Sequence, residues 1–116
     1  MNNRQKGAEG EQTALEYLQG KGYKFIDKNW HYSKSAEIDL IMKDSDTLVF
    51  VEVKTRSNTN FGHPFEAISK SKIENIKKAV SAYLSVNNTL KYKNIRIDGI
   101  AIIKTPSSIE HLKNIY

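Results

Sequence analysis

The chain has 116 residues, enough for one hydrophobic core, so a single domain spanning residues 1–116 is expected. It contains no cysteine, which excludes a disulfide framework and a thiolate metal site. No apolar run approaches the roughly 20 residues that cross a bilayer, and the first residues lack a signal-peptide core, so we expect a cytoplasmic protein without membrane contact. The net charge of +5 favours nucleic acid as a partner, and a lysine-rich surface that serves only solubility is the alternative.

The first half of the chain predicts one helix followed by extended segments. Apolar side chains recur at helical spacing over residues 4–20, and glycines then end the helix. Residues 23–30 form an extended stretch. Two further strands are predicted at residues 36–42 and 47–55, and the turn residues 43–46 between them indicate a β-hairpin.

The second half predicts a helix, a buried strand and a short closing helix. Ser71 and Glu74 fit a capping box that would begin the first of these helices, and its apolar stripe ends near residue 87. Residues 95–103 are the most apolar segment and predict a buried strand. A short helix is expected from about Ser107.

These elements give the order α-β-β-β-α-β-α. A strand, a helix and another strand in succession predict a crossover with a parallel pairing of the last strand. The expected fold class is therefore α/β, a mixed sheet flanked by helices.

Charged side chains interrupt the two apolar strands of the hairpin. Glu52 and Lys54 are two residues apart and share a face, as do Glu37 and Asp39. With a two-residue turn at residues 45–46, the register places Asp39 opposite Glu52 and Glu37 opposite Lys54. The cluster depends on this register, because a slip of one residue would send its halves to opposite faces.

Facing carboxylates repel each other, and a divalent cation removes that repulsion. Hard oxygen ligands suit Mg²⁺ or Mn²⁺, so Asp39 and Glu52 are candidate metal ligands and Lys54 would assist an attacking water. The alternative is a solvated cross-strand ladder of ion pairs. Glu11 lies in the apolar stripe of the first helix, where it would either present a further carboxylate to the metal or reach solvent at the stripe edge.

Several motifs together resemble one family. The strand pattern of Asp39 followed by Glu52-Val53-Lys54 resembles the PD-(D/E)XK nuclease superfamily. The wider match resembles the YraN family of small bacterial endonuclease-like proteins, although Ala36 and His31 depart from that family's usual glycine and arginine. The matching residues are Gly7, Gly10-Glu11, Glu37 to Ile41, Val49 to Arg56, Phe61-Gly62, Pro64, Glu66-Ala67, Lys72 and Asp98.

The resemblance implies a restriction-endonuclease-like fold related to Holliday-junction resolvases. It implies a catalytic core of Asp39, Glu52 and Lys54, with Glu11 as the carboxylate of the first helix. The expected function is a Mg²⁺- or Mn²⁺-dependent endonuclease that hydrolyses DNA phosphodiester bonds, including those of branched DNA. Cleavage of a symmetric junction would favour a homodimer.

Other basic residues could hold the nucleic-acid backbone. Arg56, Lys70 and Lys72 lie near the candidate site in sequence, and surface solubility is their alternative role. Two other functions stay open for the chain: a nucleic-acid-binding module that does not hydrolyse its ligand, and a protein-interaction subunit with an acidic partner.

Four remaining residues have no assigned chemistry. His63 and His111 lack partners at metal-ligand spacing and are assigned to no site. Trp30 is expected to pack in the core. Asp98 either supports the sheet or neighbours the site.

Overall fold

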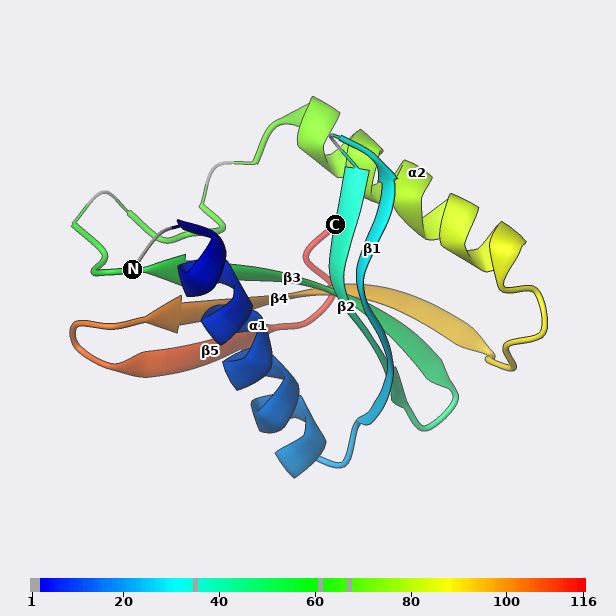
Figure 1. The fold of residues 1–116 in the computed structure, drawn as a ribbon, viewed down its shortest axis with the longest axis horizontal. Helices are drawn as coiled ribbons and strands as arrows, with labels where there is room; N and C mark the ends of the chain where they lie inside the picture. Colours follow the sequence, from blue (N-terminus) through cyan, green and yellow to red (C-terminus); the bar gives the residue numbers. More distant parts are fainter. Residues whose placement is uncertain (1–2, 35, 61, 67) are drawn as a thin grey trace.

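The computed structural model describes residues 3–34, 36–60, 62–66 and 68–116. The elements follow the order α-β-β-β-α-β-β, and the five strands form one sheet in the order β1-β2-β3-β4-β5 (Figure 1). No helix in these ranges is long and apolar enough to cross a membrane. The bounds are α1 Asn3–Gly20, β1 Lys24–Ser33, β2 Ala36–Asp44, β3 Thr47–Arg56, α2 Lys70–Val86, β4 Asn94–Ile103 and β5 Ser108–Leu112.

The mixed α/β architecture is confirmed. The chain crosses from β3 through α2 to β4, and β3 and β4 pair in parallel, whereas the other neighbouring strands are antiparallel. The helix and strands expected at 4–20, 36–42, 47–55 and 95–103 agree with the observed bounds to within two residues. The arrangement is consistent with the restriction-endonuclease-like α/β fold expected from the sequence.

The sheet separates two hydrophobic cores. Along β3, Leu48 and Phe50 pack with α2, and the alternating Val49 and Val51 pack with α1. This alternation explains why β3 is apolar at both parities, since each face is covered by a helix. The expected core role of Trp30 is confirmed, because it packs against the α2 core.

Two predicted details of the chain are wrong. The helix expected from Ser107 is instead β5, which pairs antiparallel with β4. A helix of this length would gain few hydrogen bonds, whereas a strand satisfies the free edge of β4. The helix cap is Ser69 rather than Ser71: the extended backbone of Ser69 lets its side chain accept the N–H of Lys72, whereas Ser71 already lies inside α2.

The hairpin register is confirmed near the turn. Residues 45–46 form the turn, Asp44 pairs with Thr47, and the ladder continues to the pair of Leu40 with Val51.

Beyond that pair the two predicted pairings of charged residues are not formed. The ladder does not continue to Asp39 opposite Glu52 or to Glu37 opposite Lys54. The N–H of Val53 instead donates to Asp39 Oδ2 at 2.8 Å. The Asp39 side chain thus replaces a backbone partner at the point where β2 and β3 separate, and Figure 1 shows β2 turning away from β3.

A glycine on β4 makes room for the loop that precedes α2. A Cβ atom added to Gly99 would lie 2.8 Å from Cζ of Phe65, and Gly99 does not adopt a positive φ. An alanine at this position would therefore press against the aromatic ring, whereas the backbone would not be strained.

We expect Gly99→Ala to lower the free energy of unfolding by about 1–3 kcal/mol through this overpacking. Urea denaturation of Gly99→Ala in the wild-type and Phe65→Leu backgrounds measures the effect. The cost should shrink in the Phe65→Leu background, and an equal cost in both backgrounds would contradict the packing explanation.

Candidate functional site

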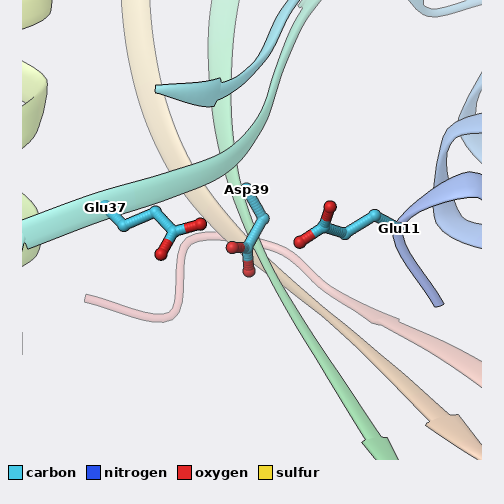
Figure 2. Close-up of side chains that lie close together, drawn as sticks. All are labelled: Glu11, Glu37 and Asp39. Atoms are coloured by element: carbon cyan, nitrogen blue, oxygen red, sulfur yellow. The ribbon is translucent and has the colours of Figure 1, made fainter. Parts of the chain in front are cut away.

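Three carboxylates converge where β2 leaves β3. Glu11 comes from α1, and Glu37 and Asp39 come from β2. Each offers one oxygen, and the three oxygens lie within 4.8 Å of one another. Figure 2 shows the three side chains pointing toward a common centre. We call these residues the acidic cluster.

The acidic cluster holds negative charge in a partly buried place. The pKa of Asp39 is raised from 3.8 to about 7, chiefly by burial. The negative charges of Glu11, Glu37 and Glu52 also raise it, whereas the hydrogen bond from the Val53 N–H lowers it. Burial and Glu37 also raise the pKa of Glu11. A proton or a cation would relieve this repulsion, and carboxylate oxygens are the donors that hard divalent cations prefer.

Glu52 has different partners. Its side chain is only 12% exposed, and Oε1 lies 3.4 Å from Nζ of Lys72 and 3.7 Å from Nζ of Lys54. The hydroxyl of Tyr116 donates to Oε2 at 2.6 Å. Both oxygens of Glu52 therefore have partners within the protein.

A cavity of about 660 Å³ joins the acidic cluster to the lysines. It brings together six of the seven residues expected from the sequence to form the site or hold nucleic acid. Lys70, the first residue of α2, is not among the described residues that line it. The expected residues in its lining are Glu11, Asp39, Glu52, Lys54, Arg56 and Lys72.

Lys54 has a second contact. Its ammonium group lies 5.6 Å from the ring centroid of Phe65, within the range of a cation–π interaction. Phe65 belongs to the loop before α2 and packs on Gly99 of β4, so this loop contacts Lys54 on β3.

Two residues of the site, Asn29 and Tyr116, were not identified from the sequence. Glu37 was placed in the charged cluster opposite Lys54, but its carboxylate joins Glu11 and Asp39. Asn29 has a positive φ of 51° and, with its amide nitrogen turned toward Glu11, lies 2.7 Å from Oε1. Tyr116 is far from β3 in sequence, and no local pattern connects it with Glu52.

The polar residues left without a role form two groups of contacts away from the cavity. Asp98 is fully buried and supports the sheet, with Arg96 Nε donating to it at 2.8 Å and His111 Nε2 lying 2.7 Å from it. Burial alone would raise the pKa of Asp98, but hydrogen bonds from His111, Arg96 and the Asn114 backbone lower it. His63 lies 2.8 Å from Glu110. None of these residues lines the cavity described above.

The chain is a mixed α/β protein with an acidic cluster beside a basic cavity wall, and comparison with known proteins shows its family. The model of the Uncharacterised protein family UPF0102 matches residues 10–102. A UPF0102 protein of Clostridioides difficile strain 630 is 41% identical over 116 residues, covering 100% of both chains. A UPF0102 protein of Syntrophomonas wolfei is 40% identical over 116 residues, covering 98% of this chain and 99% of its own. The chain therefore belongs to the UPF0102 family.

The raised pKa of Asp39 predicts a pH-dependent loss of stability. In the unfolded chain Asp39 ionises near its ordinary pKa of 3.8, but in the folded chain only near 7, so the folded state binds more protons between these values. Wild-type stability should therefore fall as pH rises through this window, by about 2–4 kcal/mol from this residue.

Asp39→Asn removes the ionisation and keeps an oxygen that can accept the N–H of Val53. Urea unfolding in the presence of a chelator, from pH 4 to pH 8, should show the variant gaining stability relative to wild type as pH rises. A difference between the two proteins that does not change with pH would contradict the burial of an ionisable Asp39.

Proposed function

We propose that this protein is a metal-dependent endonuclease that hydrolyses phosphodiester bonds in DNA. The observation that carries the proposal is the acidic cluster, whose oxygens lie within 4.8 Å of one another beside a cavity lined by cations. Carboxylates and cations on one cavity suit a ligand that has both a bound cation and a negatively charged phosphate.

The acidic cluster fits Mg²⁺ or Mn²⁺. Glu11, Glu37 and Asp39 would hold the ion, because their oxygens are hard donors and the charge of Asp39 is not balanced by a cation among its described contacts. The metal-ligand role expected for Glu52 stays a prediction: its Oε2 accepts a hydrogen bond from Tyr116, and its Oε1 lies 3.4 Å from Nζ of Lys72. A bound divalent ion would polarise a phosphoryl oxygen and lower the pKa of a coordinated water.

The basic residues of the cavity would act on the phosphate. Lys54 and Lys72 lie beside Glu52, and Arg56 is the last residue of β3. Their positive charge would bind the DNA backbone without reading its sequence. Lys54 is the most enclosed of the three, held between Glu52 and Phe65, and would stabilise the charge that develops on the phosphate during hydrolysis.

The order of these residues supports a place in the PD-(D/E)XK superfamily. Asp39 lies on β2, and Glu52 and Lys54 lie two residues apart on β3, in the middle of a mixed sheet. Glu11 on α1 reaches the same cavity. This pattern and the fold agree with the arrangement that the resemblance implies, and they support hydrolysis as the chemistry of the site.

A cleavage assay tests the proposal. Wild-type protein with Mg²⁺ or Mn²⁺ should cut at least one of linear, flapped and four-way DNA, and a chelator should stop the reaction. Asp39→Asn and Lys54→Ala should lower the rate by about 100-fold or more, because each removes charge placed at the reacting phosphate or its cation.

Glu37→Gln and Glu110→Gln form a matched pair of variants. Both glutamates lie on a strand and close to a histidine, Glu37 to His31 and Glu110 to His63, but only Glu37 belongs to the acidic cluster. Cleavage should fall in Glu37→Gln and persist in Glu110→Gln. Cleavage that survives both Asp39→Asn and Lys54→Ala would contradict the assignment, and salt-sensitive DNA binding without any cleavage would favour a binding module.

A further inference from the structure

The segment after β5 folds back toward the candidate site. Figure 1 shows the chain turning after β5 so that its end lies near the middle of the sheet. The N–H of Asn114 donates to Asp98 Oδ1 at 2.9 Å, and the N–H of Ile115 donates to the Ile97 carbonyl at 2.8 Å. Two consecutive residues are thus fixed to β4 immediately before Tyr116.

The Asp98 carboxylate that accepts the N–H of Asn114 is itself held by Arg96 and His111. Asp98 is fully buried, and Arg96 donates to both of its oxygens, at 2.8 and 2.9 Å. His111, on β5, lies 2.7 Å from Oδ2. The anchor for residue 114 is therefore a carboxylate that β4 and β5 hold in place.

Tyr116 then reaches from this anchor to Glu52. Its ring packs against the hydrophobic core on the α2 side of the sheet, and its hydroxyl donates to Glu52 Oε2. Burial and the neighbouring Glu52 raise the pKa of Tyr116 above its ordinary value, so the hydroxyl keeps its proton at neutral pH. The hydroxyl occupies one oxygen of Glu52 and leaves the other to the two lysines.

We propose that Tyr116 is a positioning residue of the candidate site. Its hydroxyl fixes the Glu52 carboxylate so that Oε1 holds Lys54 and Lys72 at the cavity wall. The use of these lysines on phosphate rests on the proposed function, but their placement by Tyr116 does not. In this arrangement Glu52 holds the ammonium groups of Lys54, on β3, and Lys72, on α2.

The chain offers a matched control for the tyrosine hydroxyl. Tyr83 also packs in the core on the α2 side, and its hydroxyl donates to the carboxylate of Asp27 at 3.4 Å. Asp27 does not line the cavity. Tyr116→Phe and Tyr83→Phe thus each keep an aromatic ring in the same core and remove one hydrogen bond to a carboxylate, but only the first touches Glu52.

The direct test is NMR of the lysine ammonium groups in both variants and in wild type. Signals of Lys54 and Lys72 are assigned with Lys54→Arg and Lys72→Arg. In Tyr116→Phe both signals should shift and their hydrogens should exchange with water faster, because the carboxylate that holds them becomes free to rotate. In Tyr83→Phe both signals should stay as in wild type. Unchanged signals in Tyr116→Phe, or equal changes in both variants, would overturn the proposal.

A second variant covers the case in which Tyr116→Phe does not fold. Glu52→Gln keeps a hydrogen-bond acceptor for Tyr116 and removes the charge that holds the lysines, so it should displace both ammonium signals. Lysine signals unchanged in Glu52→Gln would also overturn the proposal.

Cleavage kinetics give an independent result. Tyr116→Phe should lower kcat by about tenfold and leave KM within about twofold, since misplaced lysines reduce the rate more than they reduce binding. An unchanged kcat would overturn the positioning role. If wild type itself cuts no DNA, the proposed function fails, and the ammonium spectra still decide whether Tyr116 positions the lysines.

Discussion

The hydrogen bond from Val53 to Asp39 is the interaction on which the site depends. It connects β2 and β3 where their ladder ends, through a side chain instead of a backbone carbonyl. Because the strands separate there, the cavity opens between them and α1 can bring Glu11 toward Asp39. Asp39 is buried at this position, and its burial raises its pKa. The end of the ladder between β2 and β3 therefore accounts for both the place and the raised pKa of Asp39.

The charged groups of the site divide into two parts. Glu11, Glu37 and Asp39 repel one another and have room for a cation, whereas Glu52 is balanced by Lys54 and Lys72. In the proposed hydrolysis, a bound cation would draw charge from the oxygens of the phosphodiester and the positive side chains would hold it. The charge of Glu52 is balanced by the two lysines without a ligand. In the acidic cluster, a bound cation would remove the repulsion among the three carboxylates.

The sequence was sufficient for local elements and insufficient for contacts between distant ones. Periodicity located the helices and most strands, and the charges within apolar strands pointed to Asp39, Glu52 and Lys54. The assumption of a regular ladder failed because Ile38 and Leu40, which share parity, pack in opposite cores, so β2 twists between them at Asp39. The roles of Tyr116 and β5 depend on pairing with β4, which no local pattern encodes.

We propose that the acidic cluster holds a divalent cation, and anomalous diffraction from crystals of the wild-type protein grown with Mn²⁺ tests this most directly. We expect one strong peak within ligand distance, about 2 Å, of oxygens from Glu11, Glu37 and Asp39. A cavity without a peak at saturating Mn²⁺, or a peak whose ligands exclude Glu37 and Asp39, would contradict it.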